Sequence, residues 1–123
     1  MDADPNLPIS PGEGPRMRPP HRLAFKMSLH PDQTEEYKRR HDAIWPELKL
    51  LLKEAGISDY SIFLDEETCT LFGSMKIDKP TALTELPENP IMRRWWTYMK
   101  DIMESNPDHS PVSIPLKEVF YMP

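Results

Sequence analysis

The sequence predicts a small α+β domain whose elements follow one another as strand, helix, strand, strand, helix, strand. Apolar and polar residues alternate near residue 22 and again at the C-terminal end, with the two-residue period of a strand that buries one face. Two segments of helical spacing follow Pro31 and Pro90. Between these segments, two strand-like runs are joined by a connection short enough for an antiparallel hairpin.

The first 20 residues differ in composition from the rest of the chain. They hold six of the 15 prolines and almost no residue that would pack in a core. Such a segment cannot bury enough apolar surface to offset the entropy of ordering it, so residues 1–20 are predicted to form a disordered proline-rich tail. Residues 21–123 are then expected to form one domain, because 123 residues leave room for only one.

The first strand and the first helix are predicted from residue 22 onward. Apolar residues occupy every second position over residues 22–29, which predicts a strand. Pro31 suits the first turn of a helix, and the helical pattern continues to Gly56, a plausible C-terminal stop. Pro46 lies inside this pattern and removes a helix hydrogen bond. We therefore expect a break near residues 44–45, with Pro46 opening a second helical segment.

The remaining elements form the second half of the domain. Residues 59–65 and 68–77 are predicted to pair as an antiparallel hairpin. Asn89 and Pro90 resemble the cap and first residue of another helix. A last strand is predicted over residues 115–123, where apolar and polar side chains alternate. This order is that of the ferredoxin-like βαββαβ unit.

A four-stranded sheet with both helices on one side leaves its other face uncovered. The least demanding way to cover it is to pack two copies of the sheet against each other. The residue pattern therefore predicts a homodimer.

Composition excludes several classes of function. A net charge of −5 disfavours nucleic acid as a partner, because phosphate binding requires a concentrated basic surface. No stretch approaches the roughly 18 apolar residues of a membrane span, so we expect a soluble protein that is not exported. The single cysteine, Cys69, rules out an internal disulfide and is predicted to fill the core. The pairs Arg39-Arg40 and Arg93-Arg94 are predicted to be solvated helix surface.

Metal and cofactor sites are not predicted either. The four histidines are too scattered along the chain to suggest a metal-binding cluster, and glycine is too sparse for a phosphate-binding loop. We therefore expect no metal and no cofactor.

Two short motifs carry the candidate chemistry. Tyr37 and His41 are four residues apart, so on a helix they lie on one face with Cβ atoms about 5–6 Å apart. A histidine satisfied by hydrogen bonds in the core is the commoner outcome for such a pattern. Trp95 and Trp96 are adjacent and point about 100° apart, so one is expected in the core and the other is free to line a surface or cavity. The residues alone indicate only an aromatic pocket with a histidine.

The strings EEYKRRHDAIWPEL, RRWWTYMKDIM, NPDHSPVS and EVFYMP closely resemble the L-rhamnose mutarotase family, in the family's order and over about residues 22–123. The resemblance implies a dimeric α/β barrel that interconverts the α and β anomers of L-rhamnose without a cofactor, as a cytoplasmic enzyme of sugar catabolism. It also implies that His41 transfers protons and that the sugar is bound by Tyr37, Tyr60, Trp95 and Trp96. Histidine suits this role because its usual pKa near 6.5 lets it give and take protons at neutral pH.

Further residues are tied to this hypothesis less directly. Phe25 and Trp45 are possible walls of the sugar site, and Tyr37 or a water molecule is a possible partner of the anomeric hydroxyl. The chain departs from the family pattern in its proline-rich tail and at His109, where asparagine is expected. His109 would affect substrate contacts if its loop covers the pocket.

Two other functions remain open from the sequence. Since one architecture hosts unrelated chemistries, a cofactor-independent monooxygenase-like dimeric barrel acting on a flat aromatic substrate is the first. A non-catalytic sugar-binding module that keeps the pocket is the second.

Overall fold

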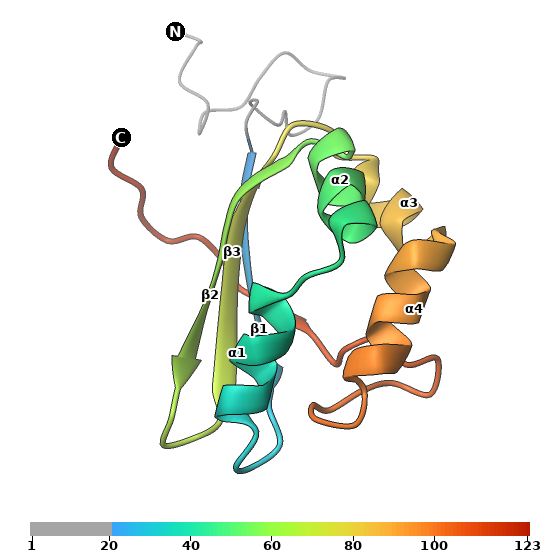
Figure 1. The fold of residues 1–123 in the computed structure, drawn as a ribbon. Coiled ribbons are helices and arrows are strands. Elements are labelled where there is room, and N and C mark those ends of the chain that lie inside the picture. The colour runs from blue at the N-terminus through green and yellow to red at the C-terminus, as the bar shows by residue number, and fades with distance from the viewer. Residues whose placement is uncertain (1–20) are drawn as a thin grey trace, which may run out of the picture.

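The computed structural model describes residues 21–123, and the tail predicted over residues 1–20 lies outside this range. Within it, four strands form one antiparallel sheet in the order β2-β3-β1-β4 (Figure 1). The strands are β1 (His21–Ser28), β2 (Ile57–Asp65), β3 (Thr70–Ile77) and β4 (Ile114–Pro115). This topology confirms the predicted α+β class and the ferredoxin-like order.

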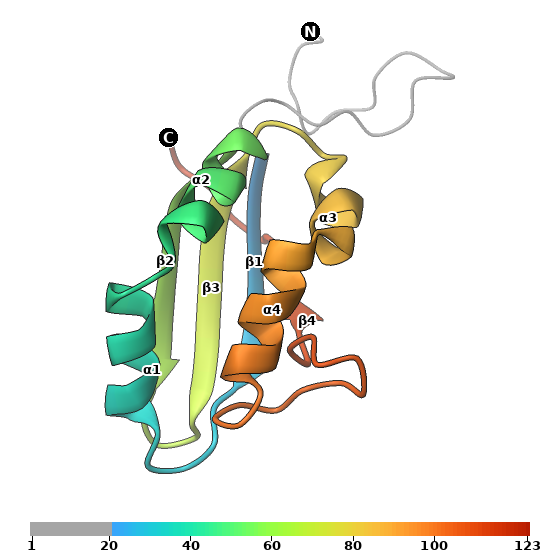
Figure 2. The same ribbon diagram turned by 45° about the vertical axis from the view of Figure 1, so that its right-hand side comes forward.

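The helices cover one side of this sheet (Figures 1 and 2), and no helix of the described residues lies on the other side. They are α1 (Thr34–Asp42), α2 (Pro46–Glu54), the short α3 (Ala82–Glu85) with the 3-10 turn η1 (Leu86–Glu88), and α4 (Pro90–Met99). We call the two sides of the sheet the helix-covered face and the open face.

Proline and capping residues set the helix boundaries largely as predicted. The first helical pattern breaks before Pro46, and Trp45 is extended (ψ 131°), as the residue preceding a proline prefers. The Asn89 side chain accepts a hydrogen bond from the Ile91 backbone N–H at 2.9 Å and caps α4. The start of α1 differs from the prediction: the helix begins at Thr34 and not near Pro31, because Asp32 has a left-handed φ of 65° that no right-handed helix accepts.

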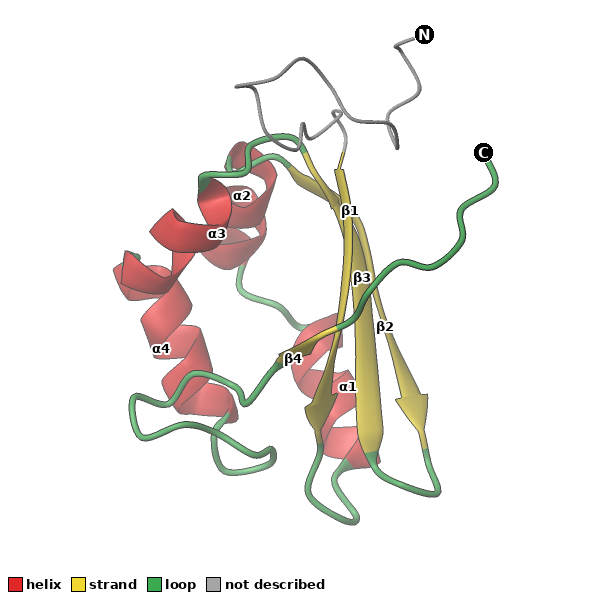
Figure 3. Cartoon of the chain, turned by 180° about the vertical axis from the view of Figure 1, so that it is seen from behind, coloured by secondary structure: helices red, strands yellow, loops and turns green. Residues whose placement is uncertain are grey.

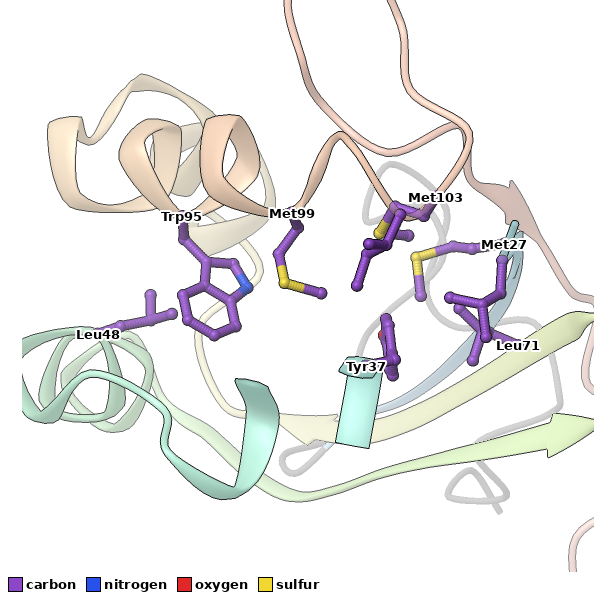
Figure 4. Packing of buried hydrophobic residues seen from close by; sticks show 9 residues of the cluster. Met27, Tyr37, Leu48, Leu71, Trp95, Met99 and Met103 are labelled. Carbon is purple, nitrogen blue, oxygen red and sulfur yellow. The ribbon is translucent and has the colours of Figure 1, made fainter. Parts of the chain in front are cut away.

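The main core lies between the helices and the helix-covered face. Leu48 on α2 and Leu71 on β3 are 1% and 2% exposed, so burial of each side chain contributes about 1.5–3 kcal/mol of stability. Trp95 and Met99 project from α4 toward Leu48 and Tyr37 (Figure 4). This helix confirms the segment of helical spacing predicted after Pro90, and the packing of these two residues holds α4 above the sheet.

Arg40 is a correction to the sequence prediction. Of the four paired arginines the other three are exposed, but Arg40 is only 9% exposed. Its guanidinium donates to the Asp101 carboxylate at 2.9 Å, to the Tyr98 carbonyl at 2.7 Å and to the Glu36 carboxylate at 2.6 Å. The planar fork of arginine can satisfy several acceptors at once, so this side chain ties α1 to the C-terminal end of α4.

The predicted last strand is also wrong in its extent. In this C-terminal region, only Ile114 and Pro115 pair with β1. The Leu116 N–H donates one further hydrogen bond to the Ala24 carbonyl, and the chain then leaves the sheet. Alternation along a sequence makes a strand only where a neighbouring backbone supplies hydrogen bonds, and none of the described residues does so here. The segment 116–123 passes across the open face (Figure 3), where Arg22 contacts Glu118 at 3.2 Å and stacks on the Tyr121 ring.

Candidate active site

A cleft of about 1120 Å³ opens between the helix-covered face and helices α1, α2 and α4. Ligand pockets are usually roughly 300–1,000 Å³, so a monosaccharide would fill only a part of this space. All five residues singled out from the sequence line the cleft: Tyr37, His41, Tyr60, Trp95 and Trp96. The fold thus brings one helix, one strand and a second helix together around one space.

His41 has a defined tautomer. Its Nδ1 lies 3.1 Å from the Tyr37 backbone carbonyl oxygen, one helical turn earlier. A carbonyl oxygen only accepts hydrogen bonds, so Nδ1 carries the proton and donates it to this bond. The neutral imidazole therefore keeps an unprotonated Nε2, whose lone pair can accept a proton from a ligand.

Aromatic neighbours hold the imidazole in place. The Tyr37 ring stacks on it with centroids 4.3 Å apart, and the Trp95 ring meets it nearly edge-on at 5.4 Å. Burial lowers the pKa of His41 below its usual 6.5, while the Tyr37 carbonyl and the Asp42 charge offset part of this effect. His41 is hydrogen-bonded like a core histidine, yet it also lines the cleft, so it is a neutral and accessible base near pH 7.

The two tyrosines are neutral hydrogen-bond donors. Burial raises the pKa of Tyr37 well above its usual value of 10, and the nearby Tyr60 adds to the shift. Burial likewise raises the pKa of Tyr60 to about 12. Tyr60 is nevertheless 40% exposed, and we attribute this exposure to the cleft that it lines, since surrounding protein still limits solvation of the hydroxyl. Both phenols remain protonated across the physiological pH range.

A β-bulge in β2 directs Tyr60 into the cleft. Ile57 and Ile62 pair with Ile77 and Gly73, which are four positions apart and lie on one face of β3, although Ile57 and Ile62 are five positions apart and strict alternation would place them on opposite faces. The register shifts between Ser58 and Ser61, and Asp59 has a left-handed φ of 48°. The extra residue restores the alternation, so that Tyr60 shares a face with Ile62 and its ring lies 6.3 Å from Phe25.

The two tryptophans are unequally buried, as the sequence predicted. Trp95 is 6% exposed and packs edge-on against Trp45 at 5.1 Å, whereas Trp96 is half-buried. Both border the cleft. Of the two further wall candidates, Phe25 lines the cleft, but Trp45 stands behind Trp95 and stacks on Tyr98. Trp45 therefore supports the wall without forming it.

Comparison with known proteins identifies the family. The family model described as L-rhamnose mutarotase matches residues 22–122. The chain belongs to the L-rhamnose mutarotase family. The L-rhamnose mutarotase of Formosa agariphila is 58% identical over 101 residues, covering 82% of this chain and 97% of the relative. That of Sinorhizobium fredii is 56% identical, with the same coverage of both chains.

A solved structure agrees with the fold of this family member. The crystal structure of L-rhamnose mutarotase from Formosa agariphila superposes with a TM-score of 0.78 at 57% sequence identity. The match covers 84% of this chain and 99% of that chain. The ferredoxin-like domain therefore extends over almost the full length of a solved mutarotase.

The loop after α4 adds cleft residues that the sequence did not indicate. Ser110, Pro111 and Ser113 line the cleft of this mutarotase family member. From the sequence, this loop was considered only as a possible cover of the pocket, through His109. The signal was the run NPDHSP, which is rich in turn-forming residues and forms a tight network in which Ser110 donates to Asp108.

His109, the departure from the family pattern, acts at a distance from the cleft. Its φ of 74° is left-handed, a region where asparagine and histidine are both enriched among non-glycine residues. Its Nδ1 lies 3.1 Å from the Thr97 hydroxyl, which already donates its proton to the Arg93 carbonyl. The Thr97 oxygen must then accept from His109 Nδ1–H, so His109 anchors the loop to α4 and does not line the cleft.

Two further observations concern residues 21–123. No group of three or more histidine, cysteine, aspartate or glutamate side chains in that range is arranged to hold a metal ion. Likewise, none of the helices in that range is long and apolar enough to cross a membrane.

Proposed function

We propose that this chain interconverts the α and β anomers of L-rhamnose, the sugar in the name of its relatives. The observation that carries the proposal is the imidazole of His41, which lines the cleft with Nδ1–H held by a backbone carbonyl and with no hydrogen bond from the described residues to Nε2. Two neutral phenols on the same cleft supply donors for sugar oxygens.

The reaction needs only proton transfers at two oxygens. The anomeric hydroxyl loses its proton, the bond between C1 and the ring oxygen breaks, and the ring oxygen gains a proton. Rotation about C1–C2 and reclosure from the other side deliver the other anomer. Because free sugars change anomer within minutes to hours, the uncatalysed barrier is on the order of 22 kcal/mol. One positioned acid or base contributes roughly 10²- to 10⁴-fold, so the reaction needs no metal.

His41 is proposed to serve both oxygens in turn. Its lowered pKa favours the neutral form, so Nε2 first accepts the proton of the anomeric hydroxyl. The imidazolium then returns the proton to the ring oxygen, which is bonded to the same carbon. Full ionisation of Tyr37 or Tyr60 is unfavourable because their pKa values are raised, so these phenols hydrogen-bond the sugar without ionising. Trp95 and Trp96 are proposed to contact its apolar face.

Saturation-transfer NMR with L-rhamnose tests the function directly. Exchange between the two anomer signals that grows with protein concentration is expected. Binding without exchange would contradict the enzyme and support a sugar-binding module. Absence of any contact with L-rhamnose would leave the monooxygenase-like alternative.

We also propose that the chain works as a homodimer joined through the open face, in the cytoplasm. Phe72 of β3 is 37% exposed there, and its cross-strand partner Phe63, on the edge strand β2, is 66% exposed and also borders the cleft. Five large hydrophobic residues of the segment 116–123 are also exposed: Leu116, Val119, Phe120, Tyr121 and Met122. Apolar surface of this kind favours association with a second copy. Light scattering coupled to size-exclusion chromatography would measure the expected doubling of mass, and cell fractionation would test the location.

A further inference from the structure

The Phe25 ring occupies the place of an absent side chain. Phe25 on β1 pairs with Gly73 on β3, and both strands present this pair to the helix-covered face. A Cβ atom added to Gly73 would lie 2.5 Å from Phe25 Cζ and 2.7 Å from Cε2. Contacts this short do not occur between such atoms, so any side chain at this position would displace the ring.

The ring also forms part of the cleft wall. Phe25 lines the cleft, and its ring meets the Tyr60 ring in a T-shaped contact with centroids 6.3 Å apart. Gly73 is buried and does not border the cleft. The Phe25 ring therefore lies between Gly73 and the space where we place the sugar. It also lies next to Tyr60, one of the two tyrosines that we propose to hydrogen-bond the sugar.

We propose that Gly73 sets the depth of the sugar site by letting the outer end of the Phe25 ring rest against the sheet. This inference rests on the proposed function. A larger residue at position 73 lifts the ring away from β3 and into the cleft, where it narrows the space beside Tyr60. Gly73 is thus a positioning residue that acts through Phe25, and Phe25 is a size-determining wall of the site.

Backbone conformation does not require glycine at this position. Among the described glycines only Gly56 has a positive φ, so the backbone at Gly73 accepts any L-residue. Glycine inside a strand weakens it relative to alanine and often marks a close approach of another group. The close approach here is the Phe25 ring, so a loss caused by Gly73→Ala would come from the displaced ring.

A double-mutant cycle tests the coupling. Gly73→Ala is expected to raise KM for anomer exchange of L-rhamnose about tenfold or more, because one methyl group in a substrate pocket changes discrimination by roughly 10- to 200-fold. In a Phe25→Leu background, where the flexible side chain can yield, Gly73→Ala is expected to change KM less than about twofold. An equal effect in both backgrounds, or no effect in the natural one, overturns the proposal.

Two controls separate this inference from other causes. Ser74→Ala, on the open face of the same strand, is expected to leave KM unchanged, and thermal unfolding shows whether Gly73→Ala alters stability alone. Nuclear Overhauser contacts between the Phe25 and Tyr60 rings report ring position without any activity, and Gly73→Ala is expected to change their pattern. If the natural chain does not exchange anomers, the proposed function fails while this ring contact still decides the role of Gly73. An unchanged pattern of contacts in Gly73→Ala overturns that role.

Discussion

The two faces of the sheet differ in what covers them, although the same strands build both. Leu71, on the helix-covered face, is 2% exposed, whereas its neighbour Phe72, on the open face, is 37% exposed. Opposite them in β2, Leu64 is half-buried and Phe63 is 66% exposed. Hydrophobic side chains at adjacent positions of one strand are thus buried on the helix-covered face and solvent-exposed on the open face. The helix-covered face holds the core and the cleft, and the open face is the surface where we place a second copy.

The largest expected effect is on the helix-covered side. His41→Ala removes the only imidazole in the cleft among the described residues and is expected to lower the exchange rate roughly 10²- to 10⁴-fold, while L-rhamnose still binds. The matched control is His30→Ala, which removes an exposed histidine outside the cleft. Saturation-transfer NMR measures both. An exchange rate untouched by His41→Ala would move the chemistry to another group.

The next largest effect is expected on stability, where a side chain of the helix-covered face should contribute more than a side chain of the open face. Leu71→Ala leaves a cavity in the core and is expected to cost about 2–5 kcal/mol of unfolding free energy. Phe72→Ala empties a site that is already partly solvated in the single chain, so its cost at low protein concentration should be smaller. Urea unfolding of both variants measures the difference. Equal losses at low concentration would contradict the contrast between the faces.

The open face should govern association. Phe72→Glu places a charge on this face at a residue that does not border the cleft and is expected to weaken the dimer by about 2 kcal/mol or more, as loss of a central interface residue does. Analytical ultracentrifugation measures the change. Ser74→Ala, on the same face of the same strand, serves as the control. A Phe72→Glu chain with unchanged mass would place the dimer contact elsewhere, or show that there is none.

The pH dependence of exchange should reflect the surroundings of His41. Since burial lowers the pKa of this imidazole, its basic form persists below pH 6.5, and activity should fall only as the pH drops through that lowered pKa. Stability follows the same sign: the unfolded chain binds the proton more readily, so the free energy of unfolding decreases as pH falls below about 6.5. An acidic limb of the rate profile above pH 6.5 would contradict a buried neutral base.

The smallest effect is expected at the loop. His109→Asn keeps a residue type that tolerates the left-handed φ and can still hydrogen-bond Thr97 through its amide. The exchange rate of His109→Asn should stay within about twofold of that of the natural chain, because the side chain at position 109 does not line the cleft. His109→Val, a β-branched residue at this φ, should destabilise the loop and affect KM more. A large loss in His109→Asn would give this histidine a direct role with the substrate.

Local patterns predicted the parts of the fold that depend on a few neighbouring residues. The helical pattern breaks before Pro46, because proline lacks an N–H and forces Trp45 into an extended conformation. Asn89 caps α4 through its own side chain. The meeting of Tyr37 and His41 followed from the helical period alone. By contrast, Arg40 was placed in solvent because its acceptor Asp101 lies far along the chain. The extent of β4 was overestimated because alternation says nothing about the neighbouring strand.

By itself, then, the sequence determined the order of the elements, the helix boundaries at Pro46 and Asn89 and the motifs of the family. Only the tertiary structure decided that the bulge at Asp59 turns Tyr60 into the cleft and that Phe25 rests on Gly73. The reason is physical: helix caps and periods involve backbone groups within about four residues, whereas strand register and ring packing involve residues that meet only after the sheet has formed.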